Sequence, residues 1–187
     1  MALTRLGLNQ SVNLASNVTG TLPTANGGTG ATSFSPGKVL QVIQGVKTDT
    51  FSNSGSTYTD ITGLSASITP SSTSNKVLVM VDAKTSCSSG NHYINLLRGS
   101  TGIYESSDIG SRTQSIGYGN QINIYDQRVT VAIFLDSPST TSATTYKCQV
   151  RAESSGTVYL NRSSDDRNTA NADGRHASSI TLYEIAG

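Results

Sequence analysis

The nine residues 144–152, TTYKCQVRA, alternate strictly between two kinds of side chain. In an extended strand successive side chains point to opposite faces, so this stretch has one apolar and one polar face. The apolar face holds Tyr146, Cys148, Val150 and Ala152. The polar face holds Lys147, Gln149 and Arg151. The pattern predicts a strand with one side in a core and the other in water.

Similar short runs, separated by Ser, Thr, Gly, Asn and Pro, fill the chain after Pro36, and none has helical periodicity. The predicted strands are 38–44, 57–61, 64–68, 76–85, 92–98, 121–125, 128–135, 144–152, 157–161 and 178–185. About ten short strands joined by turns are typical of a sandwich or barrel. We therefore expect an all-β fold, a jelly-roll-like antiparallel β-sandwich head, over residues 37–187.

Two of these strands have apolar residues on both faces. They are RVTVAIFLD, residues 128–136, and KVLVMV, residues 76–81. Such a strand is either central in a sheet or covered by a neighbouring subunit. Ser, Thr, Asn and Gly make up 84 of the 187 residues, so a single copy has few apolar side chains for a core. Both observations favour a chain that associates with copies of itself.

Residues 1–36 differ from the rest of the chain, because their apolar residues are isolated and they carry almost no charge. Such a segment cannot build a core of its own and becomes ordered by packing on another chain. We predict an extended stalk that anchors the protein, ending near the GGTG turn at residues 27–30. The predicted anchor contacts are Leu3, Leu6, Leu8, Val12 and Leu14.

Charge and hydropathy exclude several partners. The net charge is +1 and only 13% of the residues are charged, so neither a nucleic acid nor an anionic membrane is an expected partner. The longest apolar runs have five residues, which is too short to cross a bilayer. No membrane insertion is expected.

Chemical motifs give no support to an enzyme. The stretch GTGATSFSPGKV lacks the spacing of a phosphate-binding loop, no G-x-S-x-G occurs, and the chain has two histidines. The acidic loop before His176 lacks the register of a calcium or zinc site, so we expect a solvated loop without metal. Cys87 and Cys148 share parity with apolar neighbours and are expected to be buried thiols, with a disulfide as the alternative. No cofactor is expected.

A receptor site, if the head carries one, is expected in the turn-rich segment 86–126. Tyrosine faces beside hydrogen-bonding side chains suit stacking against a sugar ring. The candidate receptor-binding residues are Tyr104, Arg112 and Tyr118. The structural alternative is that these tyrosines cover sheet edges.

Several motifs resemble those of bacteriophage proteins. NLASNVTGTLPTANGGTG, residues 13–30, is similar to the recurring linker of phage tail fibres, in which a Leu-Pro precedes an ANGGTG turn. The later stretches resemble a C-terminal domain common in structural proteins of phages that infect aquatic bacteria. They are GKVLQVIQ, YTDITGLSASITPSSTSNKVLVMV, LLRGST, LDSPSTTSATTYKCQVRAESSGTVYLNRS and SSITLYEIAG.

The resemblance implies a trimeric β-structured fibre of the virion, and because no catalytic motif stands out we expect a non-enzymatic short tail fibre. The N-terminal stretch MALTRLGLNQS lacks the sustained apolar region of a signal peptide, so assembly in the host cytoplasm is expected. Its N-terminus would bind a tail, adaptor or capsid protein, and its head would bind a glycan or protein of the host surface during adsorption. The chain is shorter than most such fibres, which leaves a capsid head fibre or a decoration (cement) protein as the alternative. A glycan hydrolase is a third possibility, but no paired carboxylates stand out.

Overall fold

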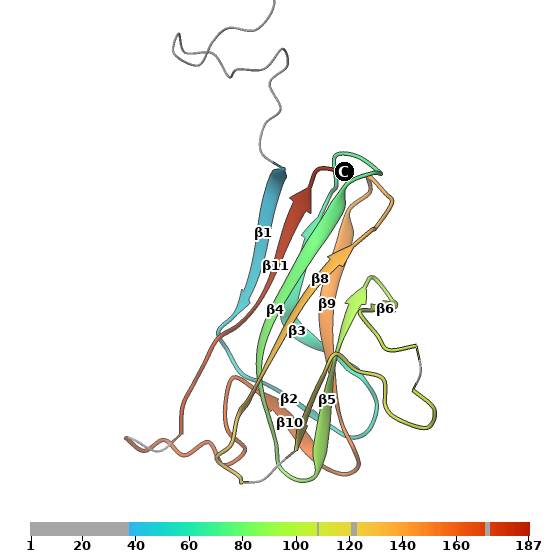
Figure 1. The fold of residues 1–187 in the computed structure, drawn as a ribbon. Coiled ribbons are helices and arrows are strands. Elements are labelled where there is room, and N and C mark those ends of the chain that lie inside the picture. Colours follow the sequence, from blue (N-terminus) through green and yellow to red (C-terminus); the bar gives the residue numbers. More distant parts are fainter. Residues whose placement is uncertain (1–37, 108, 121–122, 171–172) are drawn as a thin grey trace, which may run out of the picture. The chain divides into compact units, whose positions relative to one another are not determined.

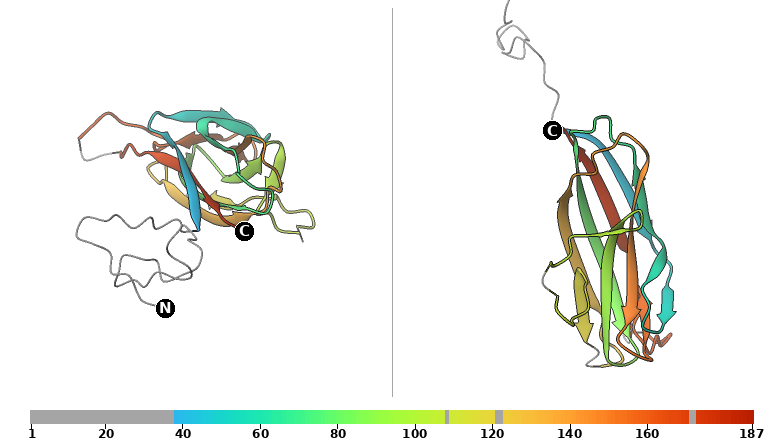
Figure 2. Two further views of the ribbon diagram at one scale, coloured as in Figure 1. Left: turned by 90° about the horizontal axis from the view of Figure 1, so that it is seen from above. Right: turned by 90° about the vertical axis from the view of Figure 1, so that its right-hand side faces the viewer.

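The computed structural model describes residues 38–107, 109–120, 123–170 and 173–187, and the described part from Lys38 to Gly187 belongs to one compact unit. All regular secondary structure in these residues is β (Figure 1). Two antiparallel sheets pack face to face as a sandwich (Figure 2). The all-β sandwich expected from the alternating runs is confirmed. The predicted stalk, residues 1–36, lies outside the described residues.

The strands of the described residues are as follows: β1 (Val39–Lys47), β2 (Phe51–Ser54), β3 (Thr59–Ile68), β4 (Lys76–Cys87), β5 (Asn91–Arg98), β6 (Thr101–Ile103), β7 (Gly117–Asn120), β8 (Arg128–Asp136), β9 (Thr144–Ala152), β10 (Thr157–Leu160) and β11 (Ser178–Ile185). The six-stranded sheet has the order β1-β11-β4-β10-β2. β11 and β10 pair with one edge of β4, and β8 pairs with its other edge. The five-stranded sheet has the order β3-β9-β5-β6, and β7 also pairs with β5.

The core lies between the two sheets. The alternation predicted for residues 144–152 is confirmed, since the four apolar side chains of β9 are all buried. Facing them across the sandwich are buried aliphatic side chains of β4 and β11. Cys87 and Cys148 are buried thiols, as predicted, and burial raises the pKa of both, that of Cys148 to about 12.

The strand predicted at residues 121–125 is wrong for residues 123–125, the part that the structure describes. The strand that pairs with β5 is Gly117–Asn120, and Asn123 to Asp126 form a turn closed by a 3.0 Å backbone hydrogen bond. Glycine has low strand propensity, so the sequence GYGN does not predict a strand although β7 is one. The predicted strands 57–61 and 64–68 are one strand, β3, with a register shift near Gly63, whose φ is +86°. The short strands β2 and β6 were not predicted.

The C-terminal strand β11 is fixed by a buried carboxylate. β11 lies between β1 and β4, and Glu184 near its end is 1% exposed. One carboxylate oxygen of Glu184 accepts hydrogen bonds from Asn75 and from the backbone and hydroxyl of Ser71, and the other accepts one from Gln41, all at 2.6–2.8 Å. Burial alone would raise the pKa of Glu184, but these donors outweigh it and lower the pKa to about 2.

We predict that Glu184→Gln lowers the free energy of unfolding by about 1 to 3 kcal/mol at pH 7, because a charged acceptor of four hydrogen bonds is lost. The folded pKa of Glu184 lies below its ordinary value of 4.5, so this stabilisation is present above pH 4.5 and is lost as the pH falls towards 2. Urea unfolding at several pH values measures the difference between variant and wild type.

The control is Glu153→Gln, which changes an exposed carboxylate that accepts one hydrogen bond from Asn91. This control should unfold like the wild type. A Glu184→Gln effect that is equal at pH 7 and pH 3 would contradict the role assigned to the ionised carboxylate.

Candidate interaction surfaces

The outward side of β8 is a row of exposed aliphatic side chains. Val129, Val131, Ile133 and Leu135 are 61%, 63%, 54% and 52% exposed. Their inward neighbours in the strand are the buried Thr130 and Ala132 and the half-buried Phe134. In the described residues β8 pairs with β4 alone, so it is an edge strand and not a central one. A central place in the sheet therefore does not explain the two apolar faces of β8, and cover by a neighbouring subunit stays a prediction.

The strand register extends this row across the sheet. Leu135 lies opposite Leu78 of β4, Leu78 opposite Tyr183 of β11, and Tyr183 opposite Val42 of β1. In the next row Ile133 lies opposite Met80. We call the whole set the apolar outer face. It consists of Val42, Val46, Leu78, Met80, Val129, Val131, Ile133, Leu135 and Tyr183.

A tie between the two sheets holds β8 in this register. Asp136 at the end of β8 is 5% exposed, and both of its oxygens accept hydrogen bonds from Arg98 of β5 at 2.8 Å. The Tyr146 hydroxyl of β9 donates to the same carboxylate at 2.6 Å. Burial and the neighbouring Asp136 raise the pKa of Tyr146. Because a one-residue slip would bury the other set of side chains, this tie decides which side chains of β8 face outward.

The outer face of the five-stranded sheet has the opposite character. Its outward side chains are mostly polar: Asp60, Ser65, Ser67, Asn91, Tyr93, Asn95, Leu97, Asn120, Thr145, Lys147, Gln149 and Arg151. Asp60 accepts hydrogen bonds from Lys147 at 2.6 Å and from Gln149 at 2.7 Å. The polar face predicted for residues 144–152 is therefore part of a hydrated sheet surface.

Aromatic side chains gather at one end of this polar face. The rings of Tyr93 and Tyr118 lie 5.6 Å apart, and the Arg151 guanidinium lies 5.7 Å from the centre of the Tyr93 ring and 5.8 Å from that of Tyr58. The Tyr118 hydroxyl donates to Asn91 Oδ1 at 2.8 Å. Burial raises the pKa of Tyr58 to about 12 despite the adjacent Arg151. We call these four residues with Asn91 the tyrosine cluster.

The glycines on either side of Tyr118 allow β7 to lie close to the core. A Cβ atom at position 119 would stand 2.2 Å from the ring of the buried His92, and one at position 117 would stand 2.5 Å from Thr130. With no inward side chains, β7 presents Tyr118 and Asn120 to the outer face, where Tyr118 is 57% exposed.

The structure does not bring the three predicted receptor-binding residues together. Tyr118 belongs to the tyrosine cluster, whereas Tyr104 stacks on Phe134 of β8 at 5.1 Å and Arg112 donates to the Ile109 carbonyl in its own loop. The sequence analysis did not name Tyr58 or Arg151 as candidate residues. The place of Arg151 on the polar face of residues 144–152 was the sign that its side chain lies on an outer surface. The predicted anchor residues, Leu3 to Leu14, lie outside the described residues.

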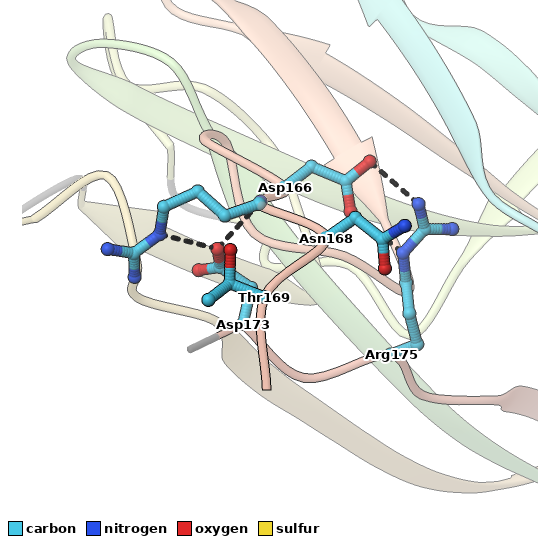
Figure 3. A pocket seen from close by; sticks show the side chains of 6 residues that line it. Asp166, Asn168, Thr169, Asp173 and Arg175 are labelled. Atoms are coloured by element: carbon cyan, nitrogen blue, oxygen red, sulfur yellow. Dashed lines mark hydrogen bonds and ion pairs between the residues drawn. The ribbon is translucent and has the colours of Figure 1, made fainter. Parts of the chain in front are cut away.

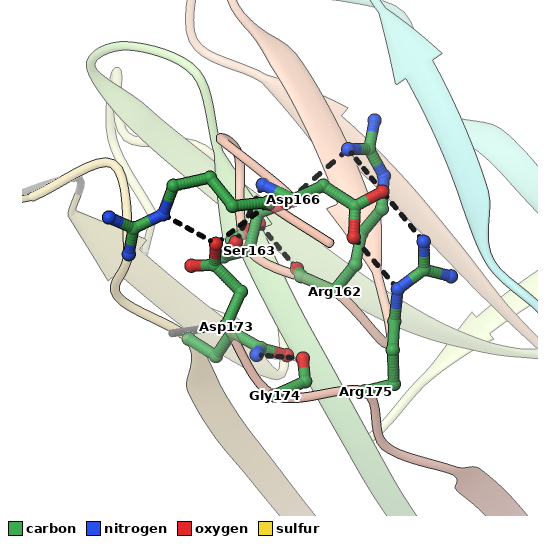
Figure 4. A network of polar contacts seen from close by, with 9 residues as sticks. Arg162, Ser163, Asp166, Asp173, Gly174 and Arg175 are labelled. Atoms are coloured by element: carbon green, nitrogen blue, oxygen red, sulfur yellow. Dashed lines mark hydrogen bonds and ion pairs between the residues drawn. The ribbon is translucent and has the colours of Figure 1, made fainter. Parts of the chain in front are cut away.

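The acidic loop before His176 is held by ion pairs. Asp166, Asp173 and Arg175 line a polar pocket with Arg167, Asn168 and Thr169 (Figure 3). Arg175 pairs with Asp166 at 2.7 Å, and Arg167 pairs with Asp173 at 2.9 Å (Figure 4). Arg162 also contacts Asp166, at 3.3 Å. Asp166 and Asp173 are thus each paired with at least one guanidinium group.

No protein-family model matches the chain, and no curated protein shows significant similarity to it. In the part of the chain that the structure describes, no helix has the length and hydropathy needed to cross a membrane.

Proposed function

We propose that this protein is a non-enzymatic structural component of a bacteriophage virion, a short tail fibre. Residues 1–36 attach it to the particle and bundle three copies, and residues 37–187 form a jelly-roll-like head that takes part in adsorption to the host. The phage-like motifs of the sequence support this proposal. The structural observation that carries it is the contrast between the two outer faces of the sandwich.

The apolar outer face supports a role in assembly. Exposed aliphatic side chains are unfavourable in water, and a contiguous patch of them is typical of a surface that contacts protein. A virion fibre is built from such contacts. The face also agrees with the expectation that copies of the chain share part of a core.

The tyrosine cluster supports a role in recognition. Tyrosine combines an apolar ring with a polar hydroxyl, and amides and a guanidinium surround the rings, a combination suited to a glycan or a polar protein surface. Each such site on an open sheet face would bind weakly. Several copies on one fibre act together, so the fibre can bind tightly through weak sites.

The second candidate is a capsid head fibre or a decoration protein that stabilises the particle. The apolar outer face favours it equally, because that face could lie against another virion protein.

Particles that lack the chain test the proposal. A short tail fibre predicts a strong loss of adsorption to host cells with unchanged resistance to heat and osmotic shock. Loss of that resistance with normal adsorption would contradict the fibre and favour decoration. A chain without residues 1–20 should fold and yet be absent from particles, and its normal incorporation would contradict the predicted anchor.

A separate prediction concerns the tyrosine cluster. Tyr118→Ala should weaken binding of the purified protein to host cells about tenfold, because an exposed aromatic contact is lost at every copy. Its thermal unfolding should change little, since the side chain is 57% exposed. Cell-binding curves with labelled protein measure the effect.

The matched control is Tyr125→Ala. It removes another exposed tyrosine, which is not part of the tyrosine cluster and whose ring contacts the Arg167 guanidinium. Equal binding by the wild type and the Tyr118→Ala variant would exclude the cluster from recognition.

A further inference from the structure

We infer that the apolar outer face is the contact between copies of this chain, with β8 of one copy covered by the six-stranded sheet of another. The inference rests on the assembly part of the proposed function. It is independent of any host receptor, so the two can fail separately.

The face supplies the apolar centre of a contact. One row of it, Leu135, Leu78, Tyr183 and Val42, is apolar across four strands. In the following rows the side chains of β8 stay apolar, whereas Gln44, Thr181, Ser179 and Asp82 of the other strands are polar. With strand spacing and residue rise in their usual range, the four strands along Val129–Leu135 measure roughly 19 Å by roughly 23 Å, about 450 Å² in projection. This is about half of the roughly 800 Å² per partner of a standard interface, in which a polar rim surrounds an apolar centre.

The edge of β8 lacks the features that normally keep an edge strand apart from other chains. Charged side chains, proline or a bulge usually prevent edge pairing. The residues from Val129 to Leu135, VTVAIFL, contain no charge and no proline, and their pairing with β4 is continuous. An uncovered strand of this kind would aggregate, so a defined partner must cover it.

The chemistry of the face favours a second copy as that partner. Two charged residues of β4 lie within the face: Asp82 is opposite Val131 and Lys84 is opposite Val129. They form an ion pair with each other, so the face offers no excess charge to a charged partner. Lys76 donates to Ser137. The outer face of the five-stranded sheet is polar and does not match it. Among the described surfaces, the one of matching chemistry is the same six-stranded sheet on another copy.

The test is the solution mass of the full-length protein and of a variant in β8. By light scattering the wild type should have a mass of two or more times 19.5 kDa. The double variant Val131→Glu/Ile133→Lys leaves the net charge unchanged and places charges at positions more than half exposed in one copy, so it should fold and should dissociate at a higher protein concentration than the wild type. The circular dichroism spectrum and a cooperative thermal transition show that it folds.

The matched control is Thr62→Glu/Ser65→Lys, which makes the same changes at exposed positions of β3, the edge strand of the other sheet. This control should keep the wild-type mass. A monomeric wild type, or a β8 variant that dissociates over the same concentration range as the wild type, overturns the inference.

If the charged variant does not fold, Val129→Thr/Val131→Thr/Ile133→Thr replaces it, because threonine keeps the branched shape and strand propensity at each β-branched position. This variant should raise the dissociation constant of the assembly at least about tenfold. An unchanged dissociation constant overturns the inference as well.

Discussion

The buried carboxylate of Asp136 ties the two sheets together, and the arrangement of the remaining side chains depends on it. Asp136 ends β8 in one sheet and accepts hydrogen bonds from Arg98 and Tyr146 in the other. Nine residue pairs then join β8 to β4 without interruption. In this register the small Thr130 and Ala132 face the core, and the large aliphatic side chains of β8 face outward. A slip by one residue would reverse the two sets and leave Asp136 without its partners.

This register makes the sandwich unequal. One outer face is polar, carries the tyrosine cluster and is compatible with water. The other carries exposed aliphatic side chains along β8 and one apolar row across four strands, and we propose that a second copy covers it. The lean composition agrees with this proposal: a chain in which Ser, Thr, Asn and Gly make up 84 of 187 residues would gain apolar burial by sharing it with a second copy. Assembly and recognition can then occupy opposite sides of one domain.

The sequence was most informative where one face of a strand is buried. The period of two in residues 144–152 predicted the orientation of β9 because burial selects apolar residues at every second position. The same rule could not decide between a central and an edge place for β8, since both leave apolar residues on two faces. It failed for β7, where glycines replace the inward side chains because His92 and Thr130 occupy their space.

The candidate surfaces were only partly predictable for a related reason. Tyr58, Tyr93, Tyr118 and Arg151 come from four separate segments, and strand pairing brings them together. The sequence pointed to the segment that holds Tyr118, but it gave no sign that Tyr104 would stack on Phe134 instead. The apolar residues on both faces of residues 128–136 indicated that this strand could be covered by a neighbouring subunit. Only the strand register showed which side chains form the apolar outer face.

Hydroxyl-radical footprinting of the full-length protein tests the central claim most directly. Leu135 on the apolar outer face and Tyr118 on the polar face are 52% and 57% exposed in one copy. With each rate divided by that of the same residue in the unfolded chain, a covered face predicts several-fold stronger protection of Leu135 than of Tyr118. Equal protection of the two side chains would show that the apolar outer face is open to water and would contradict the account.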